Sequence, residues 1–228
     1  MRWAWYKVLW LTLHVRGSFP VPAKLTPLPR SDTAERASVV DAYVQKFAAG
    51  FALPSLVSIQ GAANGARAQC VLLASATGSL GAHLVAELAA RSDVETVFCL
   101  NRVSRGSNAE QRQCKSLVEK GLKLESHHFA KLRIVETDAS KTRLGLSNEQ
   151  HDGLAHIVTV VIHNAWPMNE VRLIQGFEAQ FAVMHNPIDL VRDTACISQT
   201  ITFQFISSIA VVGHYPLWSG KAHVPGGH

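Results

Sequence analysis

Residues 70–90 read CVLLASATGSLGAHLVAELAA, an apolar run followed by small residues and then by leucines at helical spacing. The run at 70–74 predicts a buried strand, and residues 79–90 predict a helix. Gly78 in the turn lets a diphosphate approach the backbone at the helix N-terminus, and Gly81 lets the helix lie close to the strand. The unit therefore predicts a dinucleotide-binding turn, with an ordinary tight turn as the alternative.

The rest of the chain repeats this alternation of apolar runs and helical segments. The expected strands are residues 70–74, 94–100, 132–136, 157–163 and 201–206, and the expected helices are 79–90, 109–120 and one or two within 171–195. We expect Leu117 and Val118 to face the core, and Pro187 to kink or break its helix. Five strands separated by helices predict a doubly wound parallel sheet, the Rossmann-type α/β fold.

The domain organisation follows from composition along the chain. We expect residues 1–67 to form an N-terminal extension and residues 68–228 to form the NADP-binding Rossmann domain. Four prolines between residues 17 and 30 predict a linker. Ser31 or Asp32 can cap a helix that follows the linker, and its apolar positions predict that it docks on the domain.

Composition excludes several classes of protein. Of 228 residues, 47% are hydrophobic and 17% are charged, which is typical of a globular chain and not of a disordered one. The net charge of +5 can attract phosphorylated ligands, but no basic stripe indicates nucleic acid. Four scattered cysteines predict reduced thiols, and the histidines lack metal-ligand spacing.

The location of the protein is predicted from its first residues and its thiols. The apolar run within residues 1–13 is too short to cross a bilayer. A signal peptide is the less favoured alternative, because no clear cleavage site follows. We therefore expect a cytoplasmic protein that binds neither membrane nor nucleic acid.

The end of the second expected strand indicates which dinucleotide is bound. An NAD site places an acidic residue about 20 residues after the glycine turn, where it accepts from the ribose hydroxyl. This sequence has Asn101 and Arg102 there. A guanidinium fits a 2′-phosphate, so the sequence favours NADP.

Several ordered blocks resemble the thioester reductase domain of fungal carboxylic acid reductases and non-ribosomal-peptide-synthetase-like enzymes, within the extended short-chain dehydrogenase/reductase group. The blocks are VLLASATGSLGAHLVAEL at 71–88, CLNR at 99–102, DAS at 138–140, LGLS at 144–147, HNAWPMN at 163–169 and FISSI at 205–209. The resemblance covers about Cys70 to Tyr215. It departs at Ser75, where the family usually has glycine, and a positive φ there would strain the serine.

The resemblance also implies which residues form the site. Asp138 would bind the adenine, residues 163–165 would lie along the ribose and pyrophosphate, and Ser208 would orient the substrate carbonyl. The implied cofactor-binding residues are Thr77, Gly78, Ser79, Leu80, Gly81, Arg102, Asp138, His163, Asn164 and Ala165, and the implied catalytic residue is Ser208. Asp138 as a helix cap, and Ser208 as a cap or turn residue, are the structural alternatives.

The catalytic Tyr-x-x-x-Lys of that family does not occur in this sequence, because none of its three tyrosines has a lysine four residues later. We therefore expect a fold that is incomplete at the C-terminal substrate subdomain, with little activity of its own. We also expect an apolar sheet edge after the fifth strand that a partner protein could cover.

Three functions remain open at this point. The first is NADPH-dependent reduction of an acyl thioester, held on a carrier's phosphopantetheine arm or on CoA, to an aldehyde or alcohol in fungal secondary metabolism. The second is a non-catalytic NADP-binding fragment or partner subunit. The third is a nucleotide-sugar dehydrogenase or epimerase, which the HNAWP run at 163–167 disfavours.

Overall fold

The computed structural model describes residues 30–49, 68–104, 106–166, 174–197 and 201–206. Within the chain, Ala34–Ile206 forms one compact unit that contains the sheet. Across the described ranges, no helix combines the length with the apolar character that a bilayer span requires.

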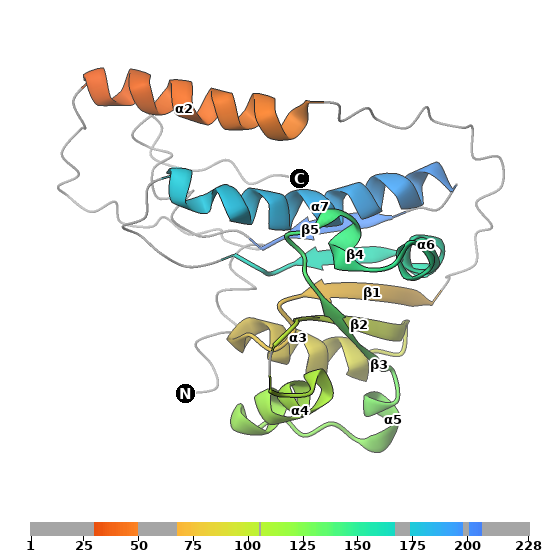
Figure 1. The fold of residues 1–228 in the computed structure, drawn as a ribbon. Coiled ribbons are helices and arrows are strands. Elements are labelled where there is room, and N and C mark those ends of the chain that lie inside the picture. The colour runs from red at the N-terminus through yellow and green to blue at the C-terminus, as the bar shows by residue number, and fades with distance from the viewer. Residues whose placement is uncertain (1–29, 50–67, 105, 167–173, 198–200, 207–228) are drawn as a thin grey trace, which may run out of the picture. The chain divides into compact units, whose positions relative to one another are not determined.

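The described strands form one parallel sheet in the order β3-β2-β1-β4-β5 (Figure 1). They are β1 Gln69–Ala74, β2 Val94–Arg102, β3 Leu132–Thr137, β4 Val160–His163 and β5 Thr202–Phe205. In the central strand, Leu73 lies opposite Cys99 of β2 and Ile162 of β4. The strand order reverses direction at β1, which confirms the predicted doubly wound α/β fold.

Helices cover both faces of this sheet. The described helices are α2 Arg30–Ala48, α3 Ser79–Ala90, α4 Ala109–Glu119, α5 Ser126–Phe129, α6 Asn148–Ile157 and α7 Glu178–Cys196, with the 3-10 turns η1 Thr142–Gly145 and η2 Ile174–Phe177. Figure 1 shows how these helices are arranged around the sheet. Side chains of α3 and α4 belong to one hydrophobic core, and those of α6 and α7 belong to the other.

Alternate residues of β1 serve these two cores. Val71 and Leu73 belong to the first core, together with Val85 of α3, whereas Leu72 belongs to the second, together with Leu190 of α7. All five side chains are at most 1% exposed. Because successive strand residues point to opposite faces, an unbroken apolar run is what a strand buried on both sides requires.

Helix α2 packs against α7 through aromatic and charged side chains. Tyr43 and Phe47 of α2 contact Phe181, with ring centroids 5.2 and 5.6 Å apart, and Lys46 forms an ion pair with Glu178. The amphipathic pattern of this segment therefore reflects packing on the neighbouring helix.

Two predicted helix boundaries are wrong. Because α2 begins at Arg30, Ser31 and Asp32 lie inside it and neither is its cap. Pro187 was expected to kink or break its helix, and the break is excluded, since the 19-residue helix α7 runs through it from Glu178 to Cys196. The proline is buried within the helix, so tertiary packing outweighs the loss of one backbone hydrogen bond.

Two further predictions, one about a helix face and one about a strand boundary, are wrong. Leu117 is buried as expected, but Val118 is 74% exposed, since the next residue of a helix points about 100° away. The strand predicted from residue 157 begins at Val160, and Ile157 ends α6 instead. Helix α6 was not predicted, although Ser147 and Gln150 form the capping box that marks its start.

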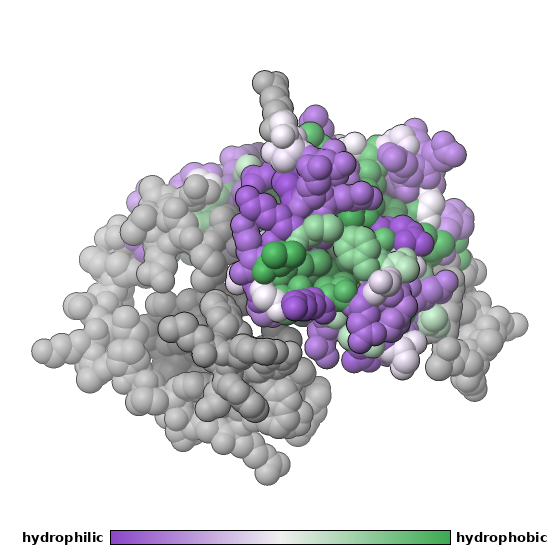
Figure 2. Space-filling view, turned by 90° about the horizontal axis from the view of Figure 1, so that it is seen from below, coloured by the Kyte–Doolittle hydropathy of each residue, from purple (hydrophilic) through white to green (hydrophobic). Residues whose placement is uncertain are grey.

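Apolar side chains also remain at the surface. Val118, Phe129 and Phe205 are each at least 40% exposed, and Figure 2 shows an apolar area within a largely hydrophilic face. Among the described strands, β5 pairs with β4 alone. Phe205 therefore adds apolar surface at the edge of the described sheet.

Replacing Val85 by alanine should lower the free energy of unfolding by about 2 kcal/mol, because the buried methyl groups are lost and a cavity remains. The same substitution at Val118, which is 74% exposed, should change stability by less than about 0.5 kcal/mol. Urea denaturation followed by circular dichroism measures both. Equal losses in the two variants would contradict the assignment of the buried helix faces.

Candidate functional site

The predicted cofactor residues lie at one edge of the sheet, where the carboxyl ends of the parallel strands meet. Thr77, Gly78, Ser79, Leu80 and Gly81 follow β1 or open α3, Arg102 ends β2, Asp138 follows β3, His163 ends β4, and Asn164 and Ala165 come directly after it. Ligands of doubly wound sheets bind beyond this edge. The predicted catalytic residue Ser208 lies outside the described residues.

The N-terminus of α3 suits an anion. Gly78 is its N-cap, no side chain caps it, and its first turn contains no acidic residue. The Gly78 amide donates to the Ser75 carbonyl at 3.1 Å, and the Gly78 carbonyl accepts from Ala82 at 2.9 Å. The other amides of the first turn have no capping side chain, and their partial positive charge can hold a diphosphate.

Gly81 permits a very close approach between α3 and the turn. A Cβ atom at this position would lie 2.0 Å from the carbonyl oxygen of Ser75 and 3.1 Å from the carbonyl carbon of Ala76. The nearest neighbour is therefore the turn itself and not the strand. Any side chain at position 81 would push the turn away from the helix.

Ser75 adopts the left-handed conformation, with φ of 61°, which is the case in which the sequence analysis expected strain at this serine. For a residue with a side chain this costs about 1–2 kcal/mol. Its Oγ atom would lie 3.0 Å from a Cβ at position 78. The Ser75 hydroxyl thus occupies space beside position 78. A side chain at position 78 would crowd this hydroxyl, whereas glycine does not.

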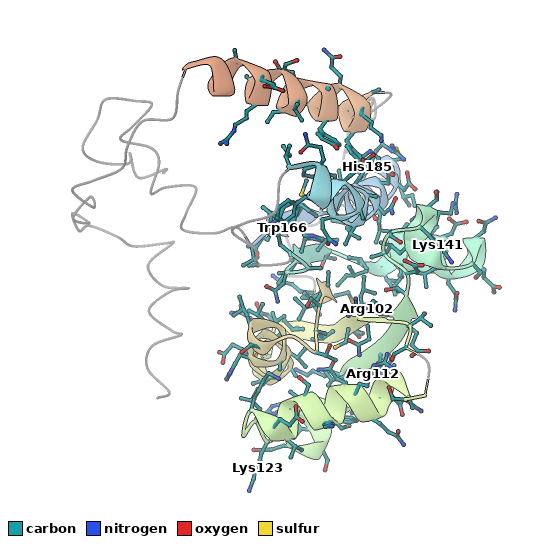
Figure 3. The ribbon with its side chains drawn as sticks, turned by 60° about the vertical axis from the view of Figure 1, so that its left-hand side comes forward. Arg102, Arg112, Lys123, Lys141, Trp166 and His185 are labelled. Atoms are coloured by element: carbon teal, nitrogen blue, oxygen red, sulfur yellow. The ribbon has the colours of Figure 1, made fainter. Side chains whose placement is uncertain are left out.

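Arg102 and Arg112 lie close together but have different environments (Figure 3). The guanidinium of Arg112 donates to the carbonyls of Arg102 and Ser107, at 2.7 and 2.5 Å, and pairs with Glu136 at 3.1 Å. Arg112 therefore holds the loop after β2 in place. Arg102 is exposed, and the structure shows no ion pair between it and another described residue.

A cavity joins this loop to the glycine turn. It has a volume of about 490 Å³, and its lining includes Thr77, Ser107, Arg112 and Lys115. The hydroxyl groups and Lys115 can bind phosphate oxygens, whereas Arg112 is already engaged by protein groups and the carboxylate of Glu119 also lines the cavity. Lys115 is 76% exposed and pairs with Glu119 at 3.8 Å.

Asp138 is held in a tight turn after β3. Its Oδ1 accepts from the hydroxyl of Ser140 at 2.5 Å and from the Ser140 amide at 3.2 Å. The Ser140 hydrogen bond lowers the pKa of Asp138, and Lys141 at 3.5 Å acts in the same direction. The carboxylate is ionised near neutral pH and can accept a hydrogen bond from a ligand.

The segment after Asp138 is strained. Arg143 and Leu144 have φ of 56° and 61° and are followed by Gly145 at 67°. The Leu144 carbonyl accepts from the Asp138 amide at 3.1 Å, and a Cβ at Gly145 would lie 3.1 Å from the Asp138 Cβ. This left-handed turn, which sequence analysis did not predict, supports Asp138.

His163 is fully buried at the end of β4, and its ring lies 5.8 Å from that of Phe205. Burial lowers the pKa of His163, and the backbone of Ala165 opposes this effect more weakly. The side chain is therefore neutral near pH 7.

Helix α4 presents buried polar groups to the site, which sequence analysis missed. Gln113 and Ser116 are 0% and 5% exposed, and they donate to the carbonyls of Ala76 and Thr77 at 3.3 and 2.8 Å. Their only signal in the sequence is polarity on the inner face of an amphipathic helix. The tertiary fold is needed to recognise it.

One group of described residues could hold a metal ion. Ligand atoms of Glu125, His127 and His128 lie within 4.8 Å of one another. They precede β3 and are thus at the opposite edge of the sheet from the glycine turn. Glu125 and His127 are largely exposed, so this group has no structural link to the cofactor site.

The residues at the carboxyl edge fit a dinucleotide. The turn leaves no room for a Cβ at Gly81, the amides of α3 are uncapped by side chains, and the buried Oδ1 of Asn101 makes no hydrogen bond within the described protein. A phosphate requires a close approach to the backbone, and a sugar or base requires an available hydrogen-bond acceptor. The fold and this site together define a dinucleotide-binding protein of the Rossmann type.

Comparison with known proteins identifies the family. A model of an NAD-binding family described as "Male sterility protein" matches residues 73–224, and the chain belongs to this family. It is 60% identical over 210 residues to the non-reducing polyketide synthase tazA of Aspergillus terreus, a match covering 92% of this chain and 8% of that protein. It is 46% identical over 199 residues to the 3-methylorcinaldehyde synthase tropA of Talaromyces stipitatus, covering 86% and 7%.

Solved reductase domains share the fold. The terminal R domain of the myxalamid PKS-NRPS pathway has a TM-score of 0.58 at 24% identity, covering 78% of this chain and 43% of that one. The PhqB reductase domain of Penicillium fellutanum has a TM-score of 0.54 at 18% identity, covering 75% and 42%. The chain thus spans less than half of these domains and 7% or 8% of the synthases. The family and fold support a nicotinamide cofactor at this site.

Replacing Ser75 by glycine should raise the free energy of unfolding by about 0.5–1 kcal/mol, because the relief of left-handed strain exceeds the added entropy of the unfolded chain. Ser75→Ala is the matched control, since it removes the hydroxyl and keeps the strained φ. Thermal and urea denaturation of both variants measure the difference. If the free energy of unfolding of Ser75→Gly were no higher than that of Ser75→Ala, the inference that position 75 is strained would be contradicted.

The pH dependence of stability should reveal buried His163. Its pKa in the folded protein lies below the ordinary value of 6.5, so the unfolded chain binds more protons as the pH falls below that value. Stability should therefore fall below about pH 6.5. In His163→Gln the contribution of His163 to the slope of the unfolding free energy against pH should disappear. In the control His83→Gln, which replaces an exposed histidine, that contribution should remain. Urea titrations between pH 5 and 8 give the slopes, and an unchanged slope in His163→Gln would contradict the prediction.

Proposed function

We propose that this chain is the NADPH-binding part of a reductase that converts an acyl thioester to an aldehyde. The observation that carries the proposal is the pairing of an uncapped α3 N-terminus with an exposed arginine at the end of β2. The first suits a diphosphate and the second suits a 2′-phosphate. Similarity to non-reducing polyketide synthases and to reductase domains supports the reaction class.

Each residue has a defined part in this proposal. The amides of residues 79–81 would bind the diphosphate, Arg102 the 2′-phosphate and Asp138 the adenine amino group. The backbone of residues 163–165 would line the ribose, with the neutral ring of His163 buried behind it. The first turn of α3 contains no acidic residue, so no carboxylate of that turn would repel the diphosphate.

The chemistry needs a hydride, which the cofactor supplies when bound. The hydride goes to the carbonyl carbon of the thioester, the carbon–sulfur bond breaks, and the sulfur leaves as a thiol after gaining a proton. Ser208 would orient the carbonyl. The sequence contains no Tyr-x-x-x-Lys, so no residue of this chain is assigned as the proton donor.

We further propose that the acyl group arrives on a phosphopantetheine arm of a carrier, in fungal secondary metabolism. A solved thiolation-reductase di-domain of an archaeal non-ribosomal peptide synthetase, with a TM-score of 0.52 at 15% identity, has this fold next to a thiolation domain. The second candidate function is cofactor binding without catalysis, which the missing tyrosine–lysine pair favours. Rapid NADPH oxidation by the purified chain with an acyl thioester would exclude that candidate.

Calorimetric titration with NADPH and NADH tests the cofactor. The chain should bind NADPH more tightly, and Arg102→Ala should weaken NADPH binding by about 10–100-fold while leaving NADH binding unchanged, because a charge-assisted hydrogen bond to phosphate is lost. Arg133→Ala is the control, since Arg133 bonds backbone at the opposite edge of the sheet. Equal affinity for the two dinucleotides, or no binding of either, would overturn the proposal.

A further inference from the structure

We propose that Gln113 and Ser116 of α4 are positioning residues that hold the glycine turn in the conformation that binds the cofactor. The inference deepens the proposed function and rests on a dinucleotide binding at this turn. Both side chains are buried beneath the turn, so they act through the backbone and not through contact with the ligand.

Gln113 connects two parts of the site. Its Nε2 donates to the Ala76 carbonyl at 3.3 Å, and its Oε1 accepts from Nδ2 of Asn101 at 3.3 Å. Ala76 lies in the glycine turn, and Asn101 precedes Arg102 at the end of β2. One amide therefore joins the turn for the diphosphate to the strand end that carries the arginine.

Ser116 holds the next peptide of the turn. Its hydroxyl donates to the Thr77 carbonyl at 2.8 Å, while Nζ of Lys120 donates to the same hydroxyl oxygen at 3.0 Å. A donor that itself accepts from an ammonium group is polarised and makes a stronger hydrogen bond. Lys120 thereby strengthens the contact of Ser116 with the turn.

The two contacts fix the direction of the turn amides. A trans peptide points its N–H opposite to its C=O. Because the carbonyls of Ala76 and Thr77 are drawn towards α4, the amides of Thr77 and Gly78 face away from it, and the Gly78 amide donates to the Ser75 carbonyl at 3.1 Å. The backbone that leads into the first turn of α3 is thus fixed by α4 before any ligand arrives, which reduces the cost of ordering the amides of residues 79–81 on binding.

The polarity of Gln113 has no other explanation in the packing. The residue is 0% exposed, and its neighbour Leu117 on the same face belongs to the hydrophobic core. An apolar side chain would fill this position without the desolvation cost of an amide. The side-chain amide of Gln113 instead satisfies the carbonyl of Ala76 in the turn and the side-chain amide of Asn101 in β2.

Arg112 extends the same function to the loop after β2. Its guanidinium holds the Arg102 carbonyl at 2.7 Å. Adjacent residues of α4 therefore fix the turn and the backbone of the arginine proposed to select NADP. The distance between the two phosphate-binding elements is set by one helix.

The test compares Gln113→Met and Ser116→Ala with Gln45→Met, an exposed glutamine of α2. NADPH binding is measured by calorimetry, and amide hydrogen exchange is measured in residues 76–80. Each site variant should bind NADPH about tenfold more weakly and exchange faster in the turn, because a buried hydrogen bond is lost. Gln45→Met should match the unchanged protein in both measurements.

A second variant separates positioning from packing. Gln113→Glu has almost the same volume, but only its protonated form can donate to the Ala76 carbonyl. Its affinity relative to the unchanged protein should be low at pH 8 and should recover towards pH 5. A relative affinity independent of pH would count against the hydrogen bond as the positioning contact.

The outcomes are distinguishable from those for the proposed function. If the unchanged chain binds no dinucleotide, the proposed function fails, and hydrogen exchange in residues 76–80 still decides whether α4 holds the turn. Wild-type affinity and wild-type exchange in both Gln113→Met and Ser116→Ala would overturn the positioning proposal. Urea denaturation of each variant identifies any loss caused by global unfolding.

Discussion

The contact between α3 and the Ser75 carbonyl constrains the whole cofactor edge. With 2.0 Å between that oxygen and the place of a Cβ at Gly81, only glycine lets the helix begin directly over the end of β1. The amides of the first helical turn then face the same edge as the ends of β2, β3 and β4. Without this approach the sheet could still form, but the diphosphate and ribose contacts would no longer share one surface.

Backbone strain is concentrated around this edge. Ser75, Arg143 and Leu144 are the non-glycine residues with positive φ in the described chain, and all three lie in turns that follow strands. Leu144 is fully buried in the second core, so packing compensates for its unfavourable conformation. Strain of this kind persists only where the surroundings over-determine it, and it often marks functional turns.

The sequence predicted the sheet well because parallel strands that are buried on both faces consist of continuous apolar residues. Ser79–Ala90 was predicted with its exact boundaries because small turn residues precede it and leucines repeat along it. Helix α6 was missed because its last residue, Ile157, continues into a β-branched run. The roles of Gln113 and Ser116 could not be predicted, since a helical pattern does not distinguish a buried amide with two partners from one that faces water.

The two arginines near β2 show why charge alone could not assign the site. In sequence, Arg102 is favoured over Arg112 for a phosphate by its place at the end of the second expected strand. In the structure Arg112 is 22% exposed and is occupied by Glu136 and by backbone carbonyls, so a phosphate would have to displace these partners. Arg102 has its carbonyl fixed by Arg112 and its guanidinium exposed. Of the two arginines, Arg102 is thus the better placed to bind a phosphate, because its guanidinium is exposed. Arg112, whose guanidinium is engaged by protein groups, holds the backbone of Arg102 in position.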